Sequence, residues 1–211
     1  LTASGGPFRN KSLKELETVT KAQALKHPNW SMGAKVTIDS ASMMNKGFEM
    51  IEAKWLFGLS PEQIQVVVHP QSIIHSMVQF EDGAVMAQLG IPDMKLPISY
   101  AFSYPERLKS SAPRLDFNQY STLTFEEPDM TRFRNLAFAF DAVKKGGNMP
   151  CILNAANEVV VEAFLKDRIG FLQMSEVIEQ TMCKASFVPT PSYDDYVRSD
   201  EEVRLIAASL F

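Results

Sequence analysis

A polar stretch between Ser40 and Glu49 carries the side chains that could do chemistry in this 211-residue chain. Ser40, Asn45 and Lys46 offer a hydroxyl, an amide and an ammonium group as hydrogen-bond donors. At the N-terminus of a helix, where free backbone N–H groups also attract anions, these donors could together hold a phosphate. Glu49 follows about one helical turn later, and its carboxylate could bind a divalent cation or act as a base.

The same spacing has a plainer interpretation. A lysine and a glutamate three residues apart on the polar face of a helix usually form a solvated ion pair, which stabilises the helix by a few tenths of a kcal/mol. Spacing alone favours that solvated pair over a catalytic or metal-binding role for Lys46 and Glu49.

Two predicted elements position these groups. Lys35 to Asp39 alternates and is rich in β-branched residues, which predicts a short strand. Ser40 and Ser42 follow as candidate N-caps of a helix from Met43 to Phe57. Apolar residues of this segment are spaced as one helical stripe, formed by Met44, Phe48, Ile51 and Trp55. The polar groups described above then share a different face of the helix.

The segment from His27 to Gly33 is predicted to be an exposed, mobile loop. Trp30 and Met32 are costly to leave in water, so a loop that carries both indicates a lid that closes over a ligand. The alternative is that Trp30 simply packs on the surface of its own domain.

Six blocks of the sequence together carry a family resemblance. In chain order they are LTASGGPFR from Leu1, HPNWSMG from His27, DSASMMNKGFEMIEA from Asp39, HPQSIIHSMV from His69, LGIPDMKLPI from Leu89 and LNAANEVVVEAFL from Leu153. The chain resembles the 1-deoxy-D-xylulose 5-phosphate reductoisomerases over essentially its whole length. Blocks of this length are far more specific than any single short motif.

The resemblance implies an oxidoreductase and isomerase of isoprenoid biosynthesis by the non-mevalonate pathway. Such an enzyme rearranges 1-deoxy-D-xylulose 5-phosphate and reduces the resulting aldehyde with NADPH to 2-C-methyl-D-erythritol 4-phosphate. A divalent metal (Mg²⁺, Mn²⁺ or Co²⁺) is implied as well, and it would polarise the carbonyl and hydroxyl oxygens of the substrate. The family also implies a homodimer, for which the exposed face of the predicted sheet is a plausible surface.

The resemblance assigns roles to particular residues. Those implied to bind substrate are Ser4, His27, Trp30, Ser40, Asn45, Lys46 and Glu49, with the phosphate end held by Ser4, Ser40, Asn45 and Lys46 and contacted by His27. Glu49, Lys46 and His27 are the candidate catalytic residues, and Glu49 is the candidate metal ligand. Met32 and Met94 are expected to lie against the nicotinamide ring, although most methionines only fill cores.

Part of the family's machinery is expected to precede Leu1. The family's other two metal-binding carboxylates, in an Asp-Ser-Glu motif, and the glycine-rich turn of a nucleotide-binding domain have no counterpart in this sequence. We therefore expect the chain alone to keep phosphate affinity at best and to be inactive. Two alternatives stay open: a non-catalytic sugar-phosphate-binding module, and another sugar-phosphate enzyme that shares only the strand, turn and helix.

The rest of the chain predicts an α+β fold. Capping-box spacing at Ser12 and Thr20 predicts two short helices, and Pro61 to Gly90 reads as mostly antiparallel sheet with a hairpin turn at Asp82-Gly83. After a proline-punctuated stretch, four helices are expected as a bundle, over Phe133 to Lys145, Cys151 to Lys166, Ser175 to Ser186 and Ser199 to Leu210. We predict a catalytic domain over 1–103, a linker over 104–128 and the helical bundle over 129–211.

Several polar residues outside the predicted site have a structural interpretation. His69 and His75 are interpreted as structural histidines, although the resemblance places Ser72 and His75 close to the site. In the second predicted helix of the bundle, Asn154, Asn157 and Glu158 could support the active-site face or form a buried polar network between helices.

Composition narrows the protein class. A net charge of −4 argues against a nucleic-acid partner, and no apolar run approaches the roughly 20 residues that span a bilayer. Cys151 and Cys183 are expected to be buried, reduced thiols of an intracellular protein. The expected location is the cytoplasm in a bacterium, or a plastid-type organelle in a eukaryote.

Overall fold

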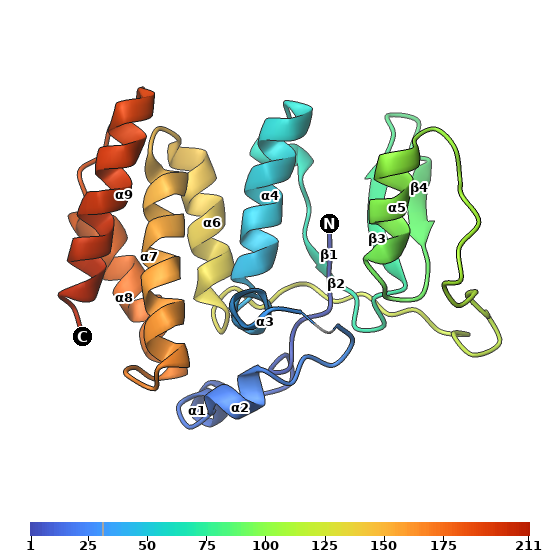
Figure 1. Cartoon of the computed structure of the whole chain (residues 1–211), viewed down its shortest axis with the longest axis horizontal. Coiled ribbons are helices and arrows are strands. Elements are labelled where there is room, and N and C mark those ends of the chain that lie inside the picture. Colours follow the sequence, from blue (N-terminus) through green and yellow to red (C-terminus); the bar gives the residue numbers. More distant parts are fainter. Residues whose placement is uncertain (31) are drawn as a thin grey trace.

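The C-terminal helices pack around one helix that is buried on several sides. The computed structural model describes residues 1–30 and 32–211. In Figure 1 the C-terminal helices stand beside the rest of the chain, and they are α6 (Arg134–Lys145), α7 (Met149–Leu165), α8 (Phe171–Lys184) and α9 (Tyr193–Ala208). Because α7 contacts α6, α8 and α9, its buried residues lie all round its axis. The four predicted helices are confirmed.

Two boundaries of the predicted bundle were wrong. Helix α8 begins at Phe171 rather than at Ser175. Helix α9 begins at Tyr193, because its capping box is formed by Ser192 and Asp195. Ser199, the predicted cap, is buried inside the helix and accepts a hydrogen bond of 2.8 Å from the Asn148 side chain.

Helix α4 (Met44–Phe57) confirms the predicted helix, but its buried face differs from the predicted stripe. The buried apolar positions include Met44, Met50 and Ala53, whereas Trp55 is 67% exposed. At Gly47 an added Cβ would lie 2.5 Å from the Cβ of Ala139 on α6. This close approach fixes α4 on the bundle.

The strand predicted over Lys35 to Asp39 was wrong, because the segment forms helix α3 (Ala34–Ala41). Ile38 and Ala41 are completely buried, three residues apart, so helical burial outweighs the β-branched composition. The Thr37 hydroxyl donates to the Gly33 carbonyl at 2.9 Å, which satisfies this β-branched residue inside a helix. Ser42 is consequently the C-cap of α3, and Met43 rather than a serine is the N-cap of α4.

The sheet residues form two separate two-stranded sheets. Strand β1 (Thr2–Ala3) pairs parallel with β2 (Val67–Val68), and β3 (Ile74–Gln79) pairs antiparallel with β4 (Val85–Leu89). The hairpin turn is confirmed, since Gly83 has a φ of +87° and the Ala84 amide donates to the Asp82 carboxylate. The α+β class is therefore confirmed, with less strand than the sequence predicts.

Short elements complete the fold. The predicted capping boxes are present on α1 (Leu13–Leu16) and α2 (Lys21–Ala24), and a 3-10 turn, η1, spans Pro61–Gln63. The sequence did not predict α5 (Lys95–Ser103), which lies beside the β3–β4 hairpin in Figure 1. We call β3, β4 and α5 together the hairpin lobe.

The buried core is continuous across these elements. Side chains from α1, α3 and α4 join those of the C-terminal helices in one cluster, which includes Leu16, Ile38, Met44, Leu136 and Ile152. Among the described residues, no helix is both long and apolar enough to cross a bilayer. Of the two cysteines, Cys151 is partly buried and Cys183 is exposed, so the expectation of two buried thiols was wrong for Cys183.

Candidate active site

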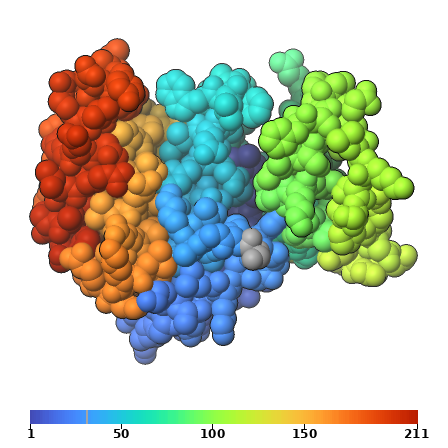
Figure 2. Space-filling view, in the orientation of Figure 1, coloured from blue at the N-terminus to red at the C-terminus, as the bar shows by residue number. Residues whose placement is uncertain are grey.

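A cavity of about 350 Å³ gathers the residues that the sequence singled out. It lies between α3 and α4 on one side and the hairpin lobe on the other, where the surface in Figure 2 is hollowed. Nine of the residues that line it carry predicted roles: Ser4, His27, Trp30, Met32, Ser40, Asn45, Lys46, Glu49 and Met94. Ser31, inside the predicted lid loop, lies outside the described residues.

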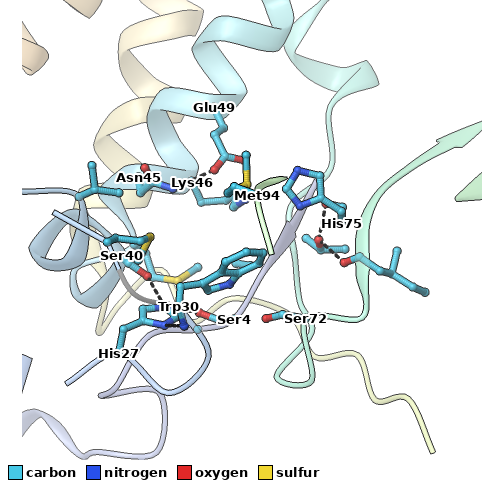
Figure 3. A pocket seen from close by; sticks show the side chains of 17 residues that line it. Ser4, His27, Trp30, Ser40, Asn45, Lys46, Glu49, Ser72, His75 and Met94 are labelled. Atoms are coloured by element: carbon cyan, nitrogen blue, oxygen red, sulfur yellow. Dashed lines mark hydrogen bonds and ion pairs between the residues drawn. The ribbon is translucent and has the colours of Figure 1, made fainter. Parts of the chain in front are cut away.

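One end of the cavity holds two hydroxyl groups and an imidazole (Figure 3). The Ser4 and Ser40 Oγ atoms each lie 3.0 Å from Nε2 of His27. Ser4 reaches this point because it directly follows β1 and the chain then turns through Gly5 and Gly6, both of which have positive φ. Ser40 reaches it from the last turn of α3.

The protonation of His27 follows from its hydrogen bonds. Its Nδ1 accepts from the backbone amides of Asn29 and Trp30, at 3.1 and 3.0 Å. The ring proton of neutral His27 therefore sits on Nε2, facing the two serine hydroxyls. Burial lowers the pKa of His27 below its ordinary value, so the ring is neutral near pH 7. Nε2–H is then a donor for an anion.

A second cluster lies on the first two turns of α4. The Glu49 carboxylate accepts from the Asn45 amide at 2.8 Å and from the Lys46 ammonium at 2.5 Å. Lys46 is only 9% exposed. This is not the solvated surface pair that the spacing alone favoured, because one partner is buried against the protein and both face the cavity.

Strained backbone marks two walls of the cavity. Met43 and Ser72 have φ values of +64° and +53°, a region that residues with a Cβ rarely adopt. Both residues line the cavity. Strain of this kind persists where the surrounding structure fixes it, and it clusters at functional sites.

The Trp30 side chain lines the cavity and faces the hairpin lobe. Its ring meets the His75 ring edge-on, with 6.5 Å between centroids. The neighbouring Asn29 side chain donates to Ser72 Oγ at 2.8 Å and to the Pro70 carbonyl at 2.7 Å. The segment before α3 is thus tied to the start of β3.

His75 is the site residue that reasoning from the sequence set aside. It lines the cavity, and its pKa is lowered by partial burial and then by the Lys46 ammonium. The signal that could have found it was the family resemblance, which places Ser72 and His75 close to the site. His69, in contrast, is completely buried, with hydrogen bonds to Thr124 and Ile73, which confirms its structural interpretation.

Glu49 is the residue that the sequence analysis predicts to bind a metal ion. Among the described residues there is no group of three or more His, Cys, Asp or Glu side chains that could hold a metal ion. Each Glu49 oxygen already accepts a hydrogen bond: Oε1 accepts from Asn45 and Oε2 accepts from Lys46. Since Mg²⁺ requires near-octahedral oxygen coordination, these residues do not form a complete metal site by themselves.

Two family models match the chain. The model described as the DXP reductoisomerase C-terminal domain matches residues 89–206, and that of the 1-deoxy-D-xylulose 5-phosphate reductoisomerase C-terminal domain matches residues 1–57. Among curated relatives, the 1-deoxy-D-xylulose 5-phosphate reductoisomerase of Phocaeicola vulgatus is 72% identical over 210 residues and that of Porphyromonas gingivalis is 58% identical. Each alignment covers 100% of this chain but only 55% and 54% of the relative, so the chain spans about half their length.

Solved structures agree with these relatives. The Zymomonas mobilis 1-deoxy-D-xylulose 5-phosphate reductoisomerase, in complex with NADPH, superposes on this chain with a TM-score of 0.91 at 46% sequence identity. The superposed region covers 100% of this chain and 54% of the Zymomonas mobilis chain. A DOX-P reductoisomerase in complex with NADPH, fosmidomycin and magnesium also gives 0.91, at 43% identity, over 99% of this chain and 53% of its own. The chain therefore belongs to the 1-deoxy-D-xylulose 5-phosphate reductoisomerase family, of which it carries the C-terminal part.

Proposed function

We propose that this chain is the substrate-binding part of an NADPH- and metal-dependent reductoisomerase. The whole enzyme would convert 1-deoxy-D-xylulose 5-phosphate to 2-C-methyl-D-erythritol 4-phosphate. The observation that carries the proposal is the meeting of anion donors and one carboxylate in a single cavity. The domain division 1–103, 104–128 and 129–211 belongs to the proposal as well.

The anion donors are arranged to hold a phosphate. The His27 Nε2–H, the Ser4 and Ser40 hydroxyls and the Asn45 amide are neutral donors, and the Lys46 ammonium supplies charge. Charge-assisted hydrogen bonds are about twice as strong as neutral ones, so Lys46 would contribute most to affinity. Holding the phosphate fixes one end of the sugar and orients the other end for reaction.

The remaining groups would handle the reacting end. Trp30 lines the cavity and would cover the bound substrate and exclude water from it. Met32 and Met94 line the cavity and offer thioether surfaces that a nicotinamide ring could pack against. Glu49 would supply one ligand to a divalent metal, and the other ligands would come from outside the described residues. We predict that the chain alone binds phosphate without turnover.

Two further properties complete the proposal. Apolar side chains exposed on the β3–β4 hairpin and the adjoining turn would form a homodimer surface, and they are Val78, Phe80, Val85 and Met86. The relatives named above are bacterial, so we propose the bacterial cytoplasm as the location.

The test uses this chain joined to the coding region that precedes it, and follows NADPH oxidation with 1-deoxy-D-xylulose 5-phosphate and Mn²⁺. The Glu49→Gln variant is compared with wild type and with Glu201→Gln, which changes an exposed glutamate on α9. We expect metal-dependent turnover that falls at least about a hundredfold in Glu49→Gln, as when a group stabilising transition-state charge is removed, and is unchanged in Glu201→Gln.

The other outcomes discriminate between functions. Turnover that survives Glu49→Gln would keep the enzyme and remove Glu49 from the metal site. A folded protein with no turnover, but with affinity for sugar phosphates, would favour the non-catalytic binding module. Turnover with a different sugar phosphate only would favour another enzyme class.

A further inference from the structure

A buried carboxylate and a buried amide meet behind the cavity, between α3 and α7. Asp39 is 2% exposed and Asn157 is completely buried. Asn157 Nδ2 donates to Asp39 Oδ1 at 2.8 Å, and the Lys35 ammonium lies 3.0 Å from Asp39 Oδ2. The other atom of the amide, Asn157 Oδ1, has no hydrogen-bond partner among the residues that the structure describes.

Stability does not explain this pair. Burying a carboxylate disfavours its charged form, and accordingly the pKa of Asp39 is raised by burial despite the hydrogen bond from Asn157 and the charge of Lys35. An unpaired buried amide oxygen is also costly. Apolar side chains of similar volume at both positions would often be at least as stable. What the pair does provide is a directional contact that sets how α3 sits on α7.

The residue positioned by this contact is Ser40, which directly follows Asp39 on α3. Helix α3 has eight residues, and its N-cap, Gly33, has no side chain to cap it. Its last turn is also packed closely against the turn that follows β1, because a Cβ at Gly6 would lie 2.6 Å from the Ser40 carbonyl oxygen. The rotation of α3 about its axis decides whether the Ser40 hydroxyl stays 3.0 Å from His27.

We infer that Asp39 and Asn157 are positioning residues for the phosphate end of the site: by fixing α3 to α7 they hold the Ser40 hydroxyl against His27. This inference rests on the proposed phosphate site, because Ser40 is one of its donors. The helical bundle then takes part in ligand binding without contacting the ligand. Such supporting contacts decide how well a site keeps its geometry.

The variant that tests the inference is Asn157→Leu, which removes the amide but keeps the number and branching of the side-chain heavy atoms. Its matched control is Asn148→Leu. Asn148 is equally buried and bonds to Ser199, Ser186 and Val188, but these partners lie away from α3. Both variants lose a buried amide of the bundle, so only the one that touches α3 should disturb the site.

The first readout is the pKa of His27, measured by NMR in the absence of phosphate. We expect Asn157→Leu to shift this titration as Ser40→Ala does, and the double variant to add nothing further. Asn148→Leu should leave the titration unchanged. An unchanged His27 titration in Asn157→Leu would overturn the inference, whether or not the chain binds phosphate.

The second readout is the affinity for inorganic phosphate, measured by calorimetry. We expect Asn157→Leu to weaken it about tenfold, the lower end of what losing a supporting partner does at metal sites, and Asn148→Leu to leave it unchanged. Wild type that binds no phosphate would contradict the proposed phosphate site, and the His27 titration would still decide the positioning role.

A reciprocal exchange guards against a variant that fails to fold. Asp39→Asn combined with Asn157→Asp restores an amide–carboxylate pair between α3 and α7. We expect the double exchange to restore the wild-type pKa of His27 and the wild-type phosphate affinity. We expect Asp39→Asn alone to restore neither property. Failure of the exchange to recover either property, in a folded protein, would argue against positioning by this contact.

Discussion

The two walls of the cavity are built differently. The wall of α3 and α4 rests on completely buried side chains such as Ile38, Ala41 and Met44. In the opposite wall, the hairpin lobe, none of the described residues of β4 or α5 is buried. Figure 2 shows the lobe set apart from the rest of the molecule beyond the hollow. A small hairpin with so little core is marginally stable by itself.

This difference separates two tasks. The groups proposed to hold an anion, Ser40, Asn45 and Lys46, lie on the wall fixed by the core. Two lining residues of the opposite wall, His75 and Met94, lie on or beside the hairpin lobe. Segments that must move with a ligand generally have low local stability. The molecule therefore combines one wall fixed by the core with another that has little core of its own.

The largest expected effect on stability concerns the helical core that supports the wall of α3 and α4. Ile152 on α7 is completely buried, so Ile152→Ala should lower the free energy of unfolding by about 2–5 kcal/mol. Denaturant unfolding measures this loss. If the variant loses less than about 1 kcal/mol, well below the range for buried Ile→Ala changes, the contrast between the walls is wrong.

A smaller effect is expected where the first turn meets α3. Gly6→Ala would place a Cβ 2.6 Å from the Ser40 carbonyl oxygen at a φ of +67°, which should lower the free energy of unfolding by about 2–3 kcal/mol. Gly33→Ala is the control, because its Cβ would meet no described atom within 4 Å. Equal unfolding midpoints for the two variants would contradict the close approach at Gly6.

The change in the free energy of unfolding with pH should be smaller than the effects of these two substitutions. It involves a histidine on each side of the cavity. Burial lowers the pKa of His27 and of His75, so the unfolded chain binds protons more readily than the folded chain at mildly acidic pH. The free energy of unfolding should therefore fall as pH drops below the ordinary histidine pKa of about 6.5 and stay highest above it. Comparing urea unfolding at several pH values with the double variant His27→Gln/His75→Gln, which should lose this slope, checks the sign.

The smallest effect on stability is expected on the hairpin lobe. Met86 on β4 is 67% exposed, so Met86→Lys should change the free energy of unfolding at low protein concentration by less than about 0.5 kcal/mol. The same variant should weaken self-association if the hairpin face forms the proposed dimer. Sedimentation equilibrium at higher concentration separates the two effects, and an unchanged association constant would remove this face from the dimer.

Long periodic segments and local turn chemistry were predictable from the sequence. Helices α4, α6 and α7 carry enough apolar repeats to be found, and Asp82-Gly83 specifies its hairpin through backbone conformation alone. Helix α3 was not found, because its eight residues include Val36, Thr37 and Ile38, whose local preference is for strand. Only its burial between α4 and α7 decides otherwise, and burial is not visible in a short segment.

The candidate site shows the same division between local and tertiary information. The polar residues on α4 could be grouped by helical spacing, but their closeness to Ser4 and His27 came only from the family resemblance. His75 was set aside because a histidine in a strand is usually structural, and nothing near it in sequence shows that β3 faces α4. From the sequence, Asn157 could be assigned either to the support of the active-site face or to a buried polar network between helices. Its partner Asp39 could not be identified, because the segment that contains Asp39 was wrongly predicted to be a strand.

The strained backbone at Met43 and Ser72 bears on how this protein responds to selection in the laboratory. Glycine would adopt the positive φ of either position without strain. At Met43, which is 3% exposed, glycine would also empty a core position and so cost more than the strain it relieves. At Ser72, which is only partly buried, glycine would relieve about 1–3 kcal/mol, less the entropy that glycine adds to the unfolded chain and the hydrogen bond from Asn29. A screen for thermostability alone would therefore accept glycine at Ser72 rather than at Met43, although Ser72 lines the cavity. Engineering a more stable protein from this chain should exclude that codon from mutagenesis, since stability gained there would alter the site.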